Sequence, residues 1–233
     1  GLQVARQVSE LFRRRVAHEG RAHQGVELLA DVLLRLRPGA GLGQFFDQGG
    51  ALDQDDAGQP GPFLGQQAQA RAALGFRLDQ KLLVIFGGSQ GPTVLNDWVR
   101  QELRTLTAAG IQICCVTGLG KGRDETIELP SNQGAPVRAQ FLMFCDRVAE
   151  LLSAADLVVS RAGAGTIAEL IRCETPAVLI PFPQAADDHQ RANAAFFERQ
   201  GAGLVIEQAS IGNLRAEVLE LIFNDALLRK FRG

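Results

Sequence analysis

Three polar segments rich in small residues hold the groups that could do chemistry, and each follows an apolar run of strand length. The first segment, residues 87–92, reads GGSQGP and comes directly after LLVIF. Adjacent glycines permit a tight turn that brings backbone N–H groups close to a ligand, and Pro92 suits the first turn of a following helix. A helix N-terminus beside the Ser89 hydroxyl is typical of an anion site, whereas the alternative is a turn whose glycines serve geometry alone.

The second segment, residues 161–166, reads RAGAGT and follows DLVVS. Its consecutive small residues predict a concave backbone with exposed donors at another helix N-terminus. Thr166 and Glu169 also have the T-x-x-E spacing of a capping box, which would give both a purely structural role. The functional alternative places the Glu169 carboxylate on the first turn of the helix, where it faces the same cleft.

The third segment, residues 181–190, reads PFPQAADDHQ and follows PAVLI. Its Asp, His and Gln side chains offer both donors and acceptors, as a sugar ring with several hydroxyls requires. Asp187, Asp188 and His189 are adjacent and could hardly converge on one ion, so we expect no metal site here. Asp188 has an alternative role as the cap of the helix that follows.

These segments need strands and helices to position them, and the sequence supplies both in alternation from about residue 78. Apolar runs such as KLLVIF, IQICCVT, DLVVS and PAVLIPF alternate with segments of helical period such as VLNDWVRQELRTL and TIAELIR. Strands that are apolar on both faces are typical of a parallel sheet covered by helices. We therefore predict an α/β fold with a Rossmann-like, doubly wound parallel sheet, whose ligands bind outside the carboxyl ends of the strands.

Composition and charge limit the classes of partner. The 233 residues are 46% hydrophobic and 21% charged, with a mean hydropathy of +0.02, as in ordinary globular proteins. A net charge of -2 predicts no nucleic-acid partner. No apolar run approaches the roughly 20 residues of a membrane-spanning helix, and the first residues do not resemble a signal peptide. The four cysteines form no CxxC pair, so we expect them to be reduced, as in the cytoplasm.

The first 70 residues differ in character from the rest. Apolar stripes within residues 4–12 and 26–36 indicate helices, whereas residues 39–70 are rich in Gly and Gln and predict a loop or disorder. The chain begins with Gly, which suggests a fragment. We therefore divide the chain into an irregular or helical segment over residues 1–70, disordered or a truncated remnant, and a Rossmann-like domain over residues 71–233.

At the three polar segments the chain closely resembles the carboxy-terminal half of the MurG family, the β-N-acetylglucosaminyltransferases of peptidoglycan synthesis. The matching motifs are LLVIFGGSQGPTVLN, FCDRVAELLSAADLVVSRAGAGTIAEL and TPAVLIPFPQAADDHQRANA, in the family's order over about residues 70–233. The resemblance implies a glycosyltransferase of the GT-B class, in which two Rossmann-like domains enclose a cleft. It implies that this half binds UDP-N-acetylglucosamine, with no cofactor and no metal.

The resemblance also implies roles for residues that match the family's motifs. Ser89 and Gln90 would contact the diphosphate or the adjacent part of the donor. The backbone amides of residues 163–166 would face the phosphates, and Glu169 would accept hydrogen bonds from the ribose hydroxyls. This picture agrees with two helix N-termini that converge on a diphosphate and one carboxylate that addresses a diol.

The remaining roles concern the two ends of the donor. The family places uracil against the backbone near Phe144, Cys145 and Asp146, and His189 with Gln190 would hold the N-acetylglucosamine hydroxyls. The candidate substrate-binding residues are thus Ser89, Gln90, Cys145, Gly163, Ala164, Gly165, Thr166, Glu169, His189 and Gln190.

The sequence departs from the family in two places. The family's amino-terminal half carries a G-G-T-G-G-H loop near the acceptor hydroxyl, and this motif does not occur here. The family's G-N-P-V-R segment has its nearest counterpart in residues 58–62, with Pro62 in place of the Arg. We therefore expect the donor-binding half of a transferase that converts lipid I to lipid II, with the lipid-linked acceptor bound only if an amino-terminal domain is supplied.

The intact family works in the cytoplasm, in peripheral contact with the inner face of the plasma membrane, and the resemblance implies the same location here. Two alternatives remain open at this point. One is a nucleotide-sugar-binding module without turnover, and the other is a different UDP-sugar enzyme of the GT-B class.

Overall fold

Seven strands form one sheet in the computed structural model, which describes residues 62–87, 93–185 and 188–232. The chain divides into the compact units Gly1–Gly65 and Gln66–Gly233, and the sheet belongs to the second. The strand order is β3-β4-β2-β1-β5-β6-β7, and all neighbouring pairs are parallel except β3 with β4. The strands are β1 (Lys81–Phe86), β2 (Ile111–Val116), β3 (Glu125–Leu129), β4 (Val137–Leu142), β5 (Leu157–Ser160), β6 (Ala177–Leu179) and β7 (Gly203–Val205).

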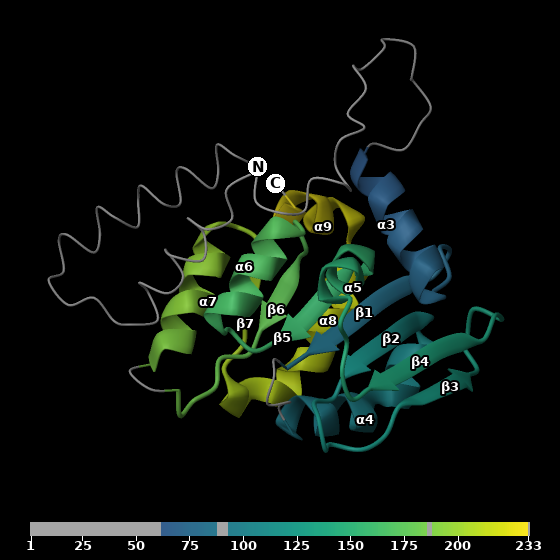
Figure 1. Ribbon diagram of the computed structural model, residues 1–233, viewed down its shortest axis with the longest axis horizontal. Coiled ribbons are helices and arrows are strands. Elements are labelled where there is room, and N and C mark those ends of the chain that lie inside the picture. The colour runs from purple at the N-terminus through teal and green to yellow at the C-terminus, as the bar shows by residue number, and fades with distance from the viewer. Residues whose placement is uncertain (1–61, 88–92, 186–187, 233) are drawn as a thin grey trace, which may run out of the picture. The chain divides into compact units, whose positions relative to one another are not determined.

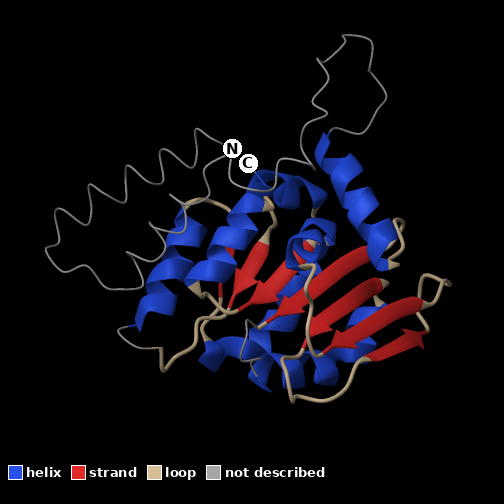
Figure 2. Ribbon diagram, in the orientation of Figure 1, coloured by secondary structure: helices blue, strands red, loops and turns tan. Residues whose placement is uncertain are grey.

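Helices cover both faces of this sheet (Figures 1 and 2). The described helices are α3 (Pro62–Leu74), α4 (Thr93–Ala108), α5 (Val148–Ala154), α6 (Ala164–Arg172), α7 (His189–Arg199), α8 (Leu214–Ile222) and α9 (Asp225–Arg232), and the 3₁₀ segment η2 (Gln208–Asn213) precedes α8. Helices α4 and α8 pack on one face, whereas α5, α6 and α7 lie on the other, with α6 beside α7. None of the described helices combines the length and the apolar character that crossing a bilayer requires.

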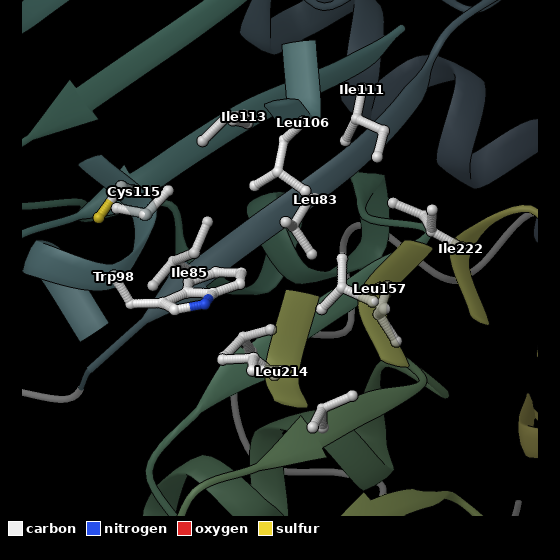
Figure 3. Close-up of a cluster of buried hydrophobic side chains, with 14 of the residues drawn as sticks. Leu83, Ile85, Trp98, Leu106, Ile111, Ile113, Cys115, Leu157, Leu214 and Ile222 are labelled. Carbon is white, nitrogen blue, oxygen red and sulfur yellow. The ribbon is translucent and has the colours of Figure 1, made fainter. Parts of the chain in front are cut away.

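The core beneath α4 and α8 is built from alternate residues of the central strands (Figure 3). Leu83 and Ile85 of β1 belong to this core, and Leu82 and Val84, which alternate with them, are equally buried on the opposite face. The buried apolar residues of α4 have helical spacing and are Leu95, Trp98, Val99 and Leu106. Burial on both faces explains why the sequence of β1 reads as a continuous apolar run.

The predicted α/β class and the Rossmann-like parallel sheet are confirmed, and the strand and helix runs expected after residue 78 are present. After residue 78, the strand β3, the 3₁₀ segment η2 and the helix α9 were not predicted. Strand β3 lies at the edge of the sheet, antiparallel to β4, and its residues alternate between half-buried and exposed. An edge strand of this kind needs no continuous apolar run, so the signal that reveals β1 is missing from it.

The loop expected over residues 39–70 is wrong for its last part, because α3 begins at Pro62. Residues 39–61 lie outside the described residues, and the predicted division of the chain after residue 70 remains a prediction. Helix α3 has no apolar stripe. Its anchors are instead polar and distant in sequence: Gln67 Nε2 donates to the carbonyl oxygen of Ala155 at 3.0 Å, and Arg71 Nη2 pairs with Asp156 at 2.5 Å.

Candidate functional site

The carboxyl ends of the parallel strands lie in one row across the sheet. Their last residues are paired in the order Leu142, Val116, Phe86, Ser160, Leu179 and Val205. Neighbouring strands are about 4.8 Å apart, so the loops that follow them leave from one edge. The chain order reverses between β1 and β5, which are neighbours in this row. A ligand of a doubly wound sheet is expected at this edge.

The loop after β5 leads into α6, whose first turn presents backbone donors. Gly163 is the N-cap, with φ -66° and ψ 147°, and because it has no side chain it makes no side-chain cap hydrogen bond. The first four N–H groups of an α-helix have no partner within the helix, and together with the helix dipole they favour an anion. A Cβ added at Gly165 would meet no atom of the described residues within 4 Å, so within this part of the chain the approach to the turn is open. The backbone geometry predicted for residues 163–166 is present, and their contact with a phosphate remains a prediction.

The capping-box alternative for Thr166 and Glu169 is wrong. A capping box requires the Thr at the N-cap, but α6 begins at Ala164, so Thr166 is its third residue and is 9% exposed. Glu169 therefore lies on the second turn, not on the first as expected. It follows Gly165 by four residues, which places these two exposed residues on one face of α6. Partial burial raises the pKa of Glu169.

Taken together, α6 offers backbone donors at its N-terminal end and a carboxylate on its exposed face, in the second turn. The amides at the N-terminus are suited to a phosphate, and a carboxylate about 5 Å further along the axis is suited to a pair of hydroxyls. This is the combination that a nucleoside diphosphate requires.

The loop after β6 leads into α7, whose first two residues are His189 and Gln190. Gln190 Oε1 accepts a hydrogen bond from the backbone N–H of Phe182 at 3.0 Å. Because the oxygen of this amide is engaged, its Nε2 is the part with donors to offer a ligand. His189 begins α7 and is half-buried. Both residues belong to the connection from β6, the strand beside β5, and their contacts with a sugar remain predictions.

Asp188 occupies the N-cap of α7, as its structural alternative predicts, but its side chain does not cap the helix. Its backbone is left-handed, with φ 56°, and its carboxylate accepts a hydrogen bond from Arg191 Nη1 at 3.1 Å. Arg191 also binds both carboxylate oxygens of Glu207, at 2.8 and 2.9 Å, which lowers the pKa of Glu207. Asp187 lies outside the described residues, among which no group of three metal ligands is found.

The structure does not bring all the predicted contact residues together. Ser89 and Gln90 lie outside the described residues, although the loop that holds them leaves β1 beside the end of β5. Cys145 follows β4, three strands from β5 and therefore about 14 Å away across the sheet. Cys145 is half-buried, and burial raises its pKa, whereas its neighbour Phe144 is 64% exposed. This separation suits the two ends of an extended ligand.

Sequence reasoning missed three residues that organise this edge. Arg161, directly after β5, and Gln208, the first residue of η2 after β7, are joined by a hydrogen bond of 2.6 Å. Asn193 of α7 donates from Nδ2 to the carbonyl oxygen of Ala162 at 3.0 Å. The signal for Arg161 was a charge directly after the buried strand LVVS. Nothing local marks Asn193 or Gln208, because their partners come from other segments.

Comparison with known proteins adds independent findings. A model of the glycosyltransferase family 28 C-terminal domain matches residues 82–230. The chain is 72% identical over 167 residues to the UDP-N-acetylglucosamine--N-acetylmuramyl-(pentapeptide) pyrophosphoryl-undecaprenol N-acetylglucosamine transferase of Opitutus terrae. It is 40% identical over 151 residues to the protein of the same name from Sorangium cellulosum.

These matches cover 72% and 64% of this chain but only 44% and 37% of the two relatives, so the chain spans less than half of their length. Among solved structures, MurG of Acinetobacter baumannii is similar with a TM-score of 0.53 and 26% identity, over 73% of this chain and 50% of that one.

Proposed function

Because this chain belongs to the glycosyltransferase family 28 C-terminal domain family, we propose that it is the donor-binding half of a transferase that moves N-acetylglucosamine from UDP-N-acetylglucosamine to lipid I. The observation that carries the proposal is on α6, where the amides of the first turn and the Glu169 carboxylate of the second turn lie at the same end of the helix. The name of the Opitutus relative, at 72% identity, supports the choice of sugar. On this proposal residues 71–233 form the UDP-sugar-binding domain and the product is lipid II.

We assign the diphosphate to the amides of residues 163–166, with Ser89 and Gln90 as further contacts from the loop after β1. A helix N-terminus stabilises an exposed anion by about 0.3–1 kcal/mol, and more where water is excluded. As the bond between sugar and diphosphate breaks, negative charge accumulates on the diphosphate. The amides then interact more strongly with the transition state than with the ground state, so they increase the rate and not only the affinity.

From the positions of the loops we assign sites to the ribose, the hexose and the uracil of the donor. Glu169 accepts hydrogen bonds from the ribose hydroxyls on the same face of α6. His189 and the Nε2 group of Gln190 hold the hexose beyond β6. Uracil lies beyond β4, beside Phe144 and Cys145, three strands from the diphosphate site.

The proposed reaction is a single displacement with inversion. The 4-hydroxyl oxygen of the acceptor sugar forms a bond to the anomeric carbon as the bond from that carbon to the diphosphate oxygen breaks, and UDP leaves. On this proposal, the base that accepts the hydroxyl proton is a residue of the part of the full-length relatives to which this chain has no counterpart. Because the acceptor is lipid-linked, we propose that the intact transferase works at the cytoplasmic face of the membrane.

Calorimetric titration of the purified chain with a series of nucleotides tests the donor site. UDP and UDP-N-acetylglucosamine are expected to bind, and UMP is expected to bind on the order of tenfold more weakly because it lacks the second phosphate. Tighter binding of another UDP-sugar would favour a different GT-B enzyme. If the chain shows a native circular dichroism spectrum and binds neither UDP nor UDP-N-acetylglucosamine, the proposal is wrong.

A second measurement, with a lipid I analogue as acceptor, separates binding from turnover. Transfer by the chain alone would exclude the binding module without turnover. Transfer that appears only when the amino-terminal half of the Opitutus relative is added would support a donor-binding half. Binding without transfer under both conditions would favour the binding module.

A further inference from the structure

The guanidinium of Arg161 lies at the carboxyl edge of the sheet, between three loops. Arg161 directly follows β5 and is 8% exposed. Its Nη1 donates to the carbonyl oxygens of Ile180 at 3.1 Å and Pro181 at 3.2 Å, and its Nη2 donates to Gln208 Oε1 at 2.6 Å. One side chain therefore joins the loops after β5, β6 and β7.

The partners of this buried cation are neutral. Within the part of the chain that the structure describes, Arg161 forms no ion pair with a carboxylate. Its Cζ lies 5.3 Å from the centroid of the Phe182 ring, which adds a cation–π contact. A guanidinium is planar and presents its donors in fixed directions, so it orients its acceptors more strictly than an ammonium group would.

The contacts continue from Arg161 to Gln190. Phe182, whose ring lies against Arg161, donates its backbone N–H to Gln190 Oε1 at 3.0 Å. The preceding carbonyl, that of Pro181, is the one bound by Nη1 of Arg161. Arg161 thus holds the peptide between Pro181 and Phe182 through its carbonyl and through the adjacent ring, and that peptide holds the amide of Gln190.

We propose that Arg161 is a positioning residue for the hexose end of the donor site, because it holds the peptide that orients the Gln190 amide toward the sugar. This inference rests on the proposed donor function. It predicts that Arg161 contributes to the preference for UDP-N-acetylglucosamine over UDP. Glu169 and the α6 amides, which we assign to UDP itself, are not bonded to Arg161.

Two other roles for Arg161 would give different results. A positive charge that acts through space on the diphosphate would strengthen the binding of UDP and UDP-N-acetylglucosamine alike. A purely structural contribution would lower the free energy of unfolding and leave the ratio of the two affinities unchanged.

Titration of Arg161→Lys and Arg161→Met with both nucleotides separates these roles. The Lys variant keeps the charge and loses the planar donors. We expect both variants to lose about fivefold to tenfold in affinity for UDP-N-acetylglucosamine and to keep their affinity for UDP. Arg100→Met is the matched control, because Arg100 also lies against a phenylalanine ring, that of Phe141 at 3.9 Å, but pairs with Glu125 of β3, at the opposite end of the strand order from β6 and β7.

A double-mutant cycle with Gln190→Ala tests whether Arg161 acts through Gln190. Once Gln190 is removed, Arg161→Lys is expected to cause no further change in the ratio of affinities. Additive losses, an unchanged ratio in the single variants, or an equal loss for UDP would each overturn the proposal. If Arg161→Met does not fold, Arg161→Lys and Gln208→Ala supply the same comparison.

Amide hydrogen exchange of Phe182 in the unliganded protein gives a readout that needs no nucleotide. We expect exchange at this N–H to become faster in Arg161→Lys and to stay unchanged in Arg100→Met. If the parent chain binds neither nucleotide but Phe182 responds, the proposed function fails and the contact from Arg161 to Gln190 stands. If the parent chain binds both nucleotides and Phe182 does not respond, the inference about Arg161 alone is overturned.

Discussion

At the amino edge of the sheet an ion-pair network joins helices to strands, whereas at the carboxyl edge buried polar side chains brace the loops and a helix begins without a cap from its N-cap side chain. Asp156, just before β5, accepts hydrogen bonds from Arg71 Nη2 at 2.5 Å and from the backbone N–H of Leu82 at 2.7 Å. Lys81 lies 4.0 Å from its other oxygen and 2.5 Å from Asp225, which lowers the pKa of Asp225. These ion pairs and hydrogen bonds attach α3 and α9 to the sheet and therefore stabilise the fold.

The carboxyl edge is organised differently. Helix α6 begins there without a side-chain cap, and the buried Arg161 binds carbonyl groups and an amide. Leu119, Phe144 and Phe182, in the loops after β2, β4 and β6, are 71%, 64% and 38% exposed. Open donors and exposed apolar side chains at the same edge indicate a surface for a ligand. The comparison suggests that the amino edge serves stability and the carboxyl edge serves binding.

Arg71→Met is expected to have the largest effect and to act on stability alone. It leaves Asp156, whose side chain is 10% exposed, without its closest cation. We expect the free energy of unfolding to fall by about 3 kcal/mol, the lower end for a broken buried pair, because Lys81 remains at 4.0 Å. Urea unfolding measures the loss, and the affinity of the folded protein for UDP is expected to be unchanged.

The control for this prediction is Arg77→Met, which removes an exposed pair with Asp79 and is expected to change stability little. A loss of UDP affinity in Arg71→Met with unchanged stability would contradict the division between the two edges.

Glu169→Ala is expected to lower the affinity for UDP and to leave stability nearly unchanged, the opposite of Arg71→Met. The ribose hydroxyls lose a charged acceptor, so UDP binding weakens by about 1 to 3 kcal/mol. The melting temperature is expected to change little, because Glu169 belongs to no capping box. Calorimetry and thermal unfolding measure the two effects, with Glu169→Gln as the variant that keeps shape and removes charge. An unchanged affinity together with a lowered melting temperature would show a structural role instead.

Gly165→Ala is expected to move stability and affinity in opposite directions. The added methyl group meets no atom of the residues that the structure describes within 4 Å, and alanine favours a helix over glycine by about 0.5 kcal/mol. The same methyl group stands at the proposed diphosphate site, so UDP affinity is expected to fall on the order of tenfold, as titration would measure.

Gly203→Ala is the contrasting control, because its Cβ would collide with the carbonyl oxygen of Ala177 and destabilise the fold. Undiminished UDP affinity in Gly165→Ala would exclude close approach of the diphosphate to the first turn of α6.

The smallest expected effect is a dependence of affinity on pH. Partial burial raises the pKa of Glu169, and hydroxyl donors from the ribose would stabilise its charged form. Affinity for UDP-N-acetylglucosamine should therefore be constant near neutral pH and fall as the pH drops through the pKa of Glu169 in the free protein. Because this pKa is raised by folding, protonation of Glu169 favours the folded state, so the titration of Glu169 does not itself unfold the protein.

Titrations from about pH 7.5 down to about pH 5 measure this effect, and the Glu169→Gln variant should show a flat profile over the same range. A decrease of equal size in Glu169→Gln would assign the dependence to another group.

How far the sequence predicts this protein differs between its elements. The sequences of β1, β2 and β5 predict the sheet, because strands that are buried on both faces consist of consecutive apolar residues. Helix α3 has no such apolar pattern. It is held instead by the polar side chains of Gln67 and Arg71, which bind groups 88 and 85 residues later in the chain. The prediction of a loop at residues 62–70 failed because amino-acid composition indicates only the local preference for helix or loop, and not the distant hydrogen-bond partners that stabilise this helix.

The candidate site divides in the same way. The sequence by itself determined that small, polar loops follow the strands, and parallel topology then places those loops at one edge. Only the tertiary structure decided that Gly163, and not Thr166, is the N-cap of α6, and that Glu169 therefore lies on the second turn. It also decided that Arg161 reaches the loops after β6 and β7. Strand and helix runs are set by neighbours along the chain, whereas caps and buried side-chain contacts depend on which segments packing brings within hydrogen-bond distance.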